Sequence, residues 1–152
     1  MDDAQSDLDF GIDILGLRLV KKTVNFDSPG VYHFYYGDER GTPGTIWTTF
    51  PYRPLGVRPG TKGSGQVTVT SFSVPEGSLD RWKARLRERG VTVSDAPPRF
   101  GEESVMVTDP SGLAIELIGT KHDTRTPWLR PGFDDASAAR GTHSVTMTID
   151  SN

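Results

Sequence analysis

The chain has 152 residues, a length that suits one domain or two small repeated units and excludes a large multidomain assembly. Its 17 basic and 20 acidic side chains give a net charge of −3, which disfavours nucleic acid as the main partner. Cysteine is absent, which excludes disulfides, thiolate metal sites and cysteine nucleophiles, so any metal has to be bound by His, Asp, Glu or Gln.

The first ten residues are acidic, whereas a signal peptide begins with basic residues and continues into an apolar run. No window approaches the roughly 18 apolar residues of a membrane-spanning helix. We therefore expect a soluble, cytoplasmic protein without a membrane partner.

The first elements expected are one helix followed by three strands. Leu8, Ile12 and Leu15 recur at helical spacing within residues 4–15, and Gly16 is expected to end this helix. Three strands follow, over residues 17–26, 31–38 and 45–52. Residues 53–65 are rich in Gly and Pro and predict a flexible connector.

A strand, a helix and three further strands are expected next. Residues 66–74 alternate between apolar and polar side chains, as a strand does. Ser78 is the expected N-cap of a helix that places Leu79, Trp82 and Leu86 on one face. The last three strands are expected over residues 91–95, 103–109 and 113–119.

The two halves repeat one architecture, because the same ten-residue spacing separates Gly16 from Phe26 and Gly90 from Phe100. The second unit opens with a strand that has no counterpart in the first. The expected fold class is α+β, with tandem βαβββ units. The expected boundaries are 1–52 for a first unit without its opening strand, 53–65 for a connector, 66–120 for the second unit, 121–141 for a linker and 142–152 for the opening strand of an incomplete third unit.

The second unit ends in a strand with the motif Asp-Pro-x-Gly-x-x-x-Glu, at residues 109–116. Together with the repeated βαβββ unit, this motif resembles the vicinal oxygen chelate superfamily, which includes glyoxalases, extradiol dioxygenases and bleomycin-resistance proteins. Residues 15–51 and 63–82 are similar, more narrowly, to the N-terminal half of hydroquinone-type ring-cleaving dioxygenases.

This resemblance implies a cup of two units around Fe(II), which two His and one Glu hold while open positions take an aromatic diol and dioxygen. It also implies that the ligands come from the opening strand of the first unit and from a fourth unit, and neither is expected in this sequence. The expected function is therefore that of the N-terminal part of a ring-cleaving dioxygenase in aromatic compound degradation. We expect this part to be inactive alone, and its own residues to hold no iron.

Two other functions remain open at this point. A small homodimeric metalloenzyme of the glyoxalase type would bring its metal ligands together from two chains. A metal-free protein of the resistance type would sequester a small aromatic molecule in an apolar groove.

Three residues are candidate metal ligands, and four are candidate substrate contacts. Glu116, on the last strand of the second unit, could bind a metal with Gln66 on the first strand, or be an inward residue bonded to a neighbour. His143 is a third candidate ligand because it begins the final strand. The candidates for an apolar cup around an aromatic ring are His33, Tyr35, Trp47 and Phe50, although core packing is the alternative for each. No catalytic residue is assigned.

Overall fold

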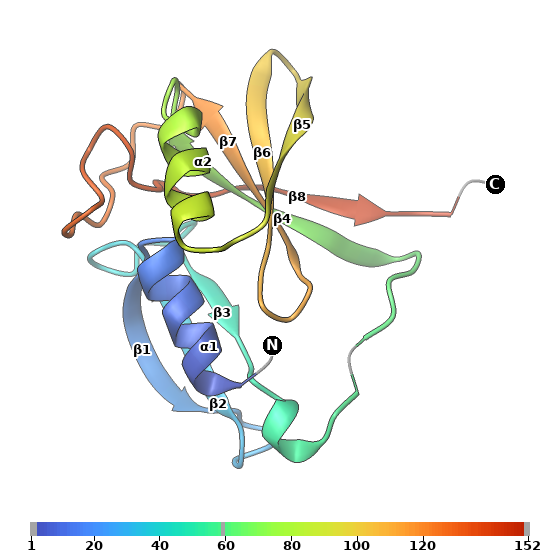
Figure 1. The fold of residues 1–152 in the computed structure, drawn as a ribbon. Helices are drawn as coiled ribbons and strands as arrows, with labels where there is room; N and C mark the ends of the chain where they lie inside the picture. The colour runs from blue at the N-terminus through green and yellow to red at the C-terminus, as the bar shows by residue number, and fades with distance from the viewer. Residues whose placement is uncertain (1–2, 59, 151–152) are drawn as a thin grey trace.

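The computed structural model describes residues 3–58 and 60–150, which form two β-sheets, each packed against one α-helix (Figure 1). The smaller sheet has three antiparallel strands in the order β1 (Arg18–Val24), β2 (Tyr32–Gly37) and β3 (Trp47–Thr49). The larger sheet has five strands in the order β5 (Val93–Arg99), β6 (Glu102–Thr108), β7 (Ala114–Thr120), β4 (Gln66–Pro75) and β8 (Gly141–Thr148). Helix α1 (Ala4–Asp9) lies over the smaller sheet and α2 (Leu79–Glu88) over the larger one. The α+β class expected from the sequence is confirmed.

Strand β4 lies inside the larger sheet, next to its edge strand β8. It pairs in parallel with β7 on one side and antiparallel with β8 on the other. The start of β4 and most of β8 project together from the body of the molecule (Figure 1). Three apolar side chains on this projecting part, Val67, Val145 and Met147, are about half exposed.

The N-terminal helix is short and changes its winding. Asp3 caps α1, because its carboxylate accepts hydrogen bonds from the backbone N–H groups of Gln5 and Ser6. A π-helical turn (Phe10–Ile14) follows directly. Gly11 in this turn lies against the ring of Tyr36, where a Cβ atom would come within 2.6 Å of a ring carbon. The close approach of helix and sheet therefore requires glycine at this position.

Two local expectations are corrected. The strand expected over residues 45–52 is reduced to the three residues of β3, because Pro51 has no N–H to donate and a 3₁₀-helix (Arg53–Leu55) follows. Ser78 does stand at the N-cap of α2, but its hydroxyl does not cap the helix. Its backbone already has helical angles, and its Oγ finds no hydrogen-bond partner among the described residues.

Residues 121–141, expected to be a linker, pack closely on the second unit. The Phe133 side chain is 3% exposed, and its ring centroid lies 5.6 Å from that of Trp82 on α2. The indole Nε1 of Trp82 donates a hydrogen bond of 2.8 Å to the carbonyl oxygen of Ser137. This segment therefore contributes Phe133 and Ala138 to the folded core.

One continuous apolar core joins the two sheets. The Trp47 ring on β3 lies 5.6 Å from Tyr36 on β2 and 5.8 Å, edge to face, from Phe72 on β4. All three side chains are at most 9% exposed. Burial of one face of each sheet in a shared core is the main source of stability expected for strands this short.

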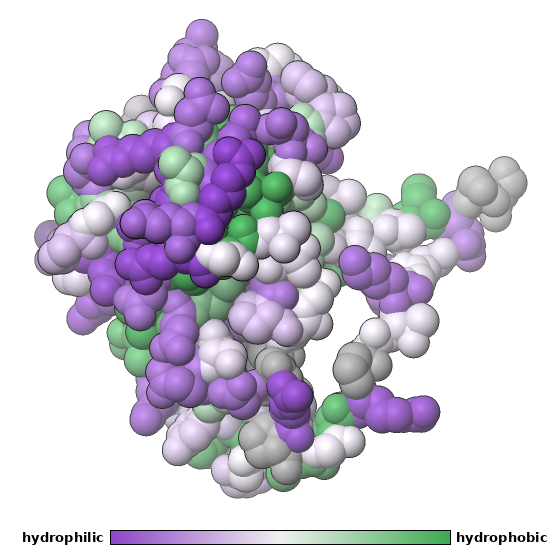
Figure 2. Space-filling model, viewed as in Figure 1, coloured by the Kyte–Doolittle hydropathy of each residue, from purple (hydrophilic) through white to green (hydrophobic). Residues whose placement is uncertain are grey.

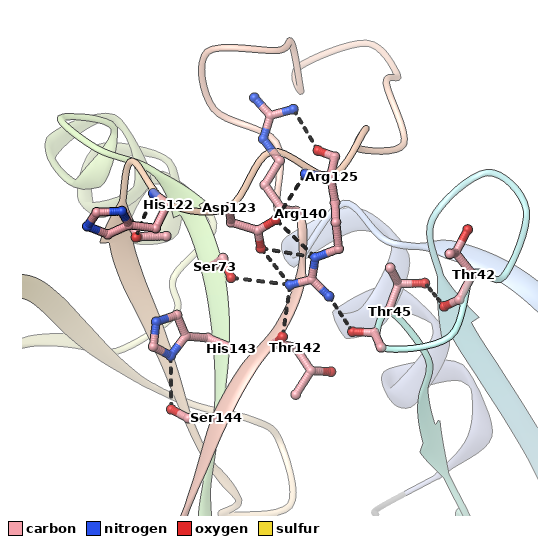
Figure 3. A network of polar contacts seen from close by, with 12 residues as sticks. Thr42, Thr45, Ser73, His122, Asp123, Arg125, Arg140, Thr142, His143 and Ser144 are labelled. Carbon is pink, nitrogen blue, oxygen red and sulfur yellow. Dashed lines mark hydrogen bonds and ion pairs between the residues drawn. The ribbon is translucent and has the colours of Figure 1, made fainter.

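A polar junction at Arg125 also ties the sheets together (Figure 3). Its guanidinium pairs with Asp123 and donates to the backbone carbonyl oxygens of Gly44, before β3, and Thr142, on β8, at 2.6 and 2.9 Å. Burial alone would raise the pKa of Asp123, but the hydrogen bonds and charge of Arg125 lower it to about 2. Asp123 is therefore ionised at neutral pH.

Hydrophilic residues cover much of the face that carries the two helices (Figure 2). Within residues 3–58 and 60–150, no helix is both long and apolar enough to cross a bilayer.

A buried carboxyl group lies beneath α1. Asp7 is 1% exposed and accepts a hydrogen bond from the Thr49 hydroxyl through Oδ2, while Oδ1 has no partner among the described residues. Burial raises the pKa of Asp7 to about 6, and the Asp109 carboxylate contributes in the same direction. The nearby Tyr36 hydroxyl is also buried and also without a hydrogen-bond partner in the described structure.

Arg125→Met should lower the free energy of unfolding by roughly 2–4 kcal/mol, because it leaves the mostly buried Asp123 carboxylate without its cation. Arg81→Met is the matched control, since Arg81 and Asp134 form an ion pair that is more than half exposed on both sides. Its removal should cost clearly less than the removal of Arg125, because solvent screens an exposed ion pair. Urea titration at pH 7.5 measures both losses, and equal losses would contradict the structural role of the junction.

Asp7→Asn should stabilise the protein by about 1–3 kcal/mol at pH 7.5 and have little effect at pH 3.5. The folded state binds a proton at Asp7 more tightly than the unfolded state does, because the folded pKa is about 6 rather than 3.8. The contribution of the protonated group is therefore complete below about pH 4 and is lost as the pH rises through 6. Urea titration of both proteins at the two pH values tests this, and an equal change at both values would contradict it.

Candidate functional site

Each strand of the smaller sheet has one face against α1 and one face that no helix covers. On β2, Phe34 and Tyr36 are fully buried against the helix, while His33 and Tyr35 alternate with them and lie on the uncovered face. The register of β2 with its neighbours places Lys21 and Thr48 beside Tyr35 on that face. The uncovered face therefore combines aromatic, basic and hydroxyl side chains.

His33, Tyr35 and Phe50 make up a compact group, which we call the aromatic face. The His33 ring stacks on Phe50 at a centroid distance of 4.0 Å and lies 4.1 Å from the Tyr35 ring. The Tyr35 hydroxyl and His33 Nδ1 are 3.0 Å apart and share a hydrogen bond. The structure thus brings together three of the four residues expected to contact an aromatic substrate.

His33 is the polar centre of the aromatic face. Burial lowers the pKa of its imidazole, and the positive charge of Lys21 lowers it further. The ring is therefore neutral at pH 7. Its Nε2 atom is buried and has no hydrogen-bond partner among the described residues.

Trp47, the fourth expected contact, lies mainly in the core rather than on the aromatic face. Adjacent strand residues point to opposite faces, so Trp47 and Thr48 diverge, and the indole packs against Tyr36 and Phe72. Only 9% of the Trp47 side chain is exposed. Where it does reach the surface, it borders a hollow of about 490 Å³ between β3 and the near ends of β4 and β7.

This hollow adjoins the aromatic face, because Phe50 borders both. Phe50 and Tyr52 border it from the end of β3, and Lys62 borders it from the connector. The Tyr52 hydroxyl accepts a hydrogen bond of 2.6 Å from Asn25 Nδ2. Asn25 gives no signal in the sequence, because it is separated from Tyr52 by 27 positions and only the pairing of β2 with both β1 and β3 brings the two residues close.

Glu116 lies on the uncovered face of the larger sheet, fully engaged by neighbours. Its Oε2 accepts hydrogen bonds of 2.6 Å from both Ser71 Oγ and Arg99 Nη2, and its Oε1 accepts one of 2.8 Å from Ser104 Oγ. The side chain is 3% exposed, whereas that of Arg99 is 44% exposed. We call these four residues the Glu116 cluster.

His143 and Gln66 do not join the Glu116 cluster through any contact in the described structure. His143 is the extra residue of a bulge in β8, and its Nε2 lies 3.3 Å from the Glu102 carboxylate. Gln66 is exposed at the opposite end of β4, bonded to the carbonyl oxygen of Thr61 and the N–H of Gly63. The β4 residue directly opposite Glu116 is Ser71, which sequence spacing did not identify.

The residues present do not fit the iron that the family resemblance implies. Across residues 3–58 and 60–150, no group of three or more His, Asp or Glu side chains is arranged to hold a metal ion. Glu116 already receives three hydrogen bonds, one of them from a cation. No chemical step can therefore be derived through a metal bound by these residues.

Known proteins with similar sequences are ring-cleaving dioxygenases. A chlorohydroquinone/hydroquinone 1,2-dioxygenase of Sphingobium indicum is 41% identical over 98% of this chain and 47% of its own length. MhqO of Bacillus subtilis (strain 168), assigned as a ring-cleaving dioxygenase, is 47% identical over 94% of this chain and 45% of its own length. The chain thus spans about half the length of these relatives.

Solved structures and a family model agree with these similarities. A crystal structure of a protein from Bacillus subtilis subsp. subtilis str. 168, assigned as a dioxygenase, matches 97% of this chain and 46% of its own with a TM-score of 0.89 and 41% identity. The model of the Glyoxalase/Bleomycin resistance protein/Dioxygenase superfamily matches residues 1–117. The two sheets and their helices agree with this family model, which matches most of the sequence. The chain belongs to the glyoxalase/bleomycin resistance protein/dioxygenase superfamily.

Proposed function

We propose that this chain supplies the aromatic-binding part of a ring-cleaving dioxygenase that acts on hydroquinone-like molecules, and that it does not bind the catalytic iron by itself. The observation that carries this proposal is the aromatic face of His33, Tyr35 and Phe50 beside the hollow of about 490 Å³, which Phe50 also borders. Aromatic rings next to hydroxyl groups such as those of Thr48 and Tyr52 offer the stacking and the hydrogen bonds that favour a hydroxylated ring. The names of relatives that cover nearly the whole chain support this choice of substrate class.

Metal-dependent ring cleavage should need residues beyond the described ones. Divalent metals are typical of this superfamily and of its dioxygenases, and such a site takes three protein ligands while leaving positions open. Glu116, His143 and Gln66 do not converge here: Glu116 is paired with Arg99, and His143 with Glu102. The small dimeric metalloenzyme is less well supported for the same reason, because Gln66 lies five positions along β4 from the residue opposite Glu116.

Anaerobic addition of Fe(II), followed by desalting, should leave far less than one iron per chain. The expected oxygen uptake with hydroquinone is zero, because the described residues offer no ligand set. The Sphingobium indicum relative, treated identically, is the positive control. One iron per chain together with oxygen uptake by this chain alone would contradict the proposal.

Phe50→Ala should weaken binding of hydroquinone roughly five- to tenfold, because it removes the ring that stacks on His33. His33→Ala should have a similar effect through loss of the imidazole. Phe100→Ala is the matched control, since Phe100 is fully exposed on the turn between β5 and β6. Chemical-shift titration with hydroquinone measures the three affinities, and equal affinity in the Phe50 variant and the control would contradict a role of this face.

A metal-free binding protein is the second candidate, favoured specifically by the Glu116 cluster. Its carboxylate already has a cation from within the chain, so a ligand bound nearby would need no metal. This candidate predicts hydroquinone binding that is unchanged by a chelator. The metal-free binding protein differs from the part of a ring-cleaving dioxygenase only in whether further protein residues complete a catalytic centre.

A further inference from the structure

Charge is distributed unevenly along the chain, and the segment that borders the hollow is basic. Residues 40–75 contain no Asp or Glu and four basic side chains, which are Arg40, Arg53, Arg58 and Lys62. The rest of the chain has 13 basic and 20 acidic side chains. The basic segment includes β3, the connector and β4, all of which border the hollow of about 490 Å³. A positive region therefore lies beside this hollow in a chain whose net charge is −3.

Lys62 is the charged residue at the border of the hollow. Among the described residues that line it, the others are apolar, aromatic, hydroxyl or amide side chains and glycines. In the part of the chain that the structure describes, no carboxylate forms an ion pair with the Lys62 ammonium group. Its charge is therefore available to a ligand in the hollow.

Gln66 fixes the connector on both sides of Lys62. The carboxamide of Gln66 accepts a hydrogen bond of 3.2 Å from the N–H of Gly63 and donates one of 3.2 Å to the carbonyl oxygen of Thr61. Thr61, Lys62 and Gln66 all border the hollow. The backbone at Lys62 is thus held at this border by the first residue of β4.

A second cation lies on the aromatic face. The Lys21 ammonium group is 5.3 Å from the centroid of the Tyr35 ring. Lys21, too, has no ion pair with a carboxylate within residues 3–58 and 60–150. The aromatic face and the hollow share Phe50, so a ring bound at Phe50 lies between two uncompensated positive charges.

We infer that this site favours aromatic rings that carry a negative charge, such as a hydroxylated benzoate, and that Lys62 contacts the anionic group. The inference rests on the proposed function, because it names the substrate class of the same aromatic face and hollow. Aromatic side chains stack on the ring, and the ammonium group donates a charge-assisted hydrogen bond to a carboxylate. Lys62 is therefore a specificity residue rather than a catalytic one.

Three ligands with the same dihydroxylated ring test this inference: hydroquinone, 2,5-dihydroxybenzoate and 2,5-dihydroxybenzamide. The last two differ mainly in charge, because the amide is neutral. Chemical-shift titration of the full chain at pH 7 and low ionic strength should show that the carboxylate ligand binds roughly fivefold more tightly than the amide. Added salt should reduce this preference, because it screens the attraction between exposed charges.

Variants of Lys62 assign the preference to this residue. Lys62→Met should bring the two affinities close to each other, whereas Lys62→Arg, which keeps the charge, should retain the preference. Lys121→Met is the matched control and should also retain it, since Lys121 is exposed beyond the end of β7 that lies away from the hollow. Circular dichroism checks that each variant is folded.

The outcomes separate this inference from the proposed function. If hydroquinone and the amide bind but the carboxylate ligand binds no more tightly, the inference is overturned and the proposed function stands. An unchanged preference in folded Lys62→Met also overturns the inference, because the charge then acts from elsewhere. If none of the three ligands binds, both the inference and the proposed function are overturned.

Discussion

The contact between Trp47 on β3 and Phe72 on β4 is the interaction on which the rest of the structure depends. A unit of three short strands and one short helix buries little apolar surface by itself, and the larger sheet also needs cover for its own apolar side. The edge-to-face packing of these two rings merges the two cores into one. At the edge of the same boundary, Arg125 donates hydrogen bonds to the carbonyl oxygens of Gly44 and Thr142 and so joins the two sheets.

Committing one face of each sheet to this core leaves the opposite faces available for polar and aromatic groups. The two faces have been used differently. The smaller sheet presents His33 with an unused nitrogen among aromatic rings, whereas the larger sheet presents Glu116 with every oxygen occupied. One face is therefore suited to receive a ligand, and the other is already saturated by the chain itself.

The sequence predicted the class of fold and most strands, because alternation and helical spacing are local properties. It also grouped His33, Tyr35 and Phe50, since two of them share a strand face and the third follows the next strand. The sequence did not predict contacts between residues on strands that are distant from one another in the chain. Identifying Ser71 rather than Gln66 as the neighbour of Glu116 required the register of β4 with β7. Identifying Arg99 as the partner of Glu116 required the folding of a hairpin turn.

The position of Trp47 also affects the tryptophan fluorescence of the protein. Its indole lies at the boundary between the sheets, whereas that of Trp82 lies under residues 121–141 and Trp128 is stacked beneath the Arg18 guanidinium. Indole emission depends on the immediate surroundings, so single-tryptophan forms of the chain would report separately on the sheet boundary, on the packed C-terminal segment and on the surface. The three tryptophans thus allow partial opening of one unit to be distinguished from loss of the whole fold.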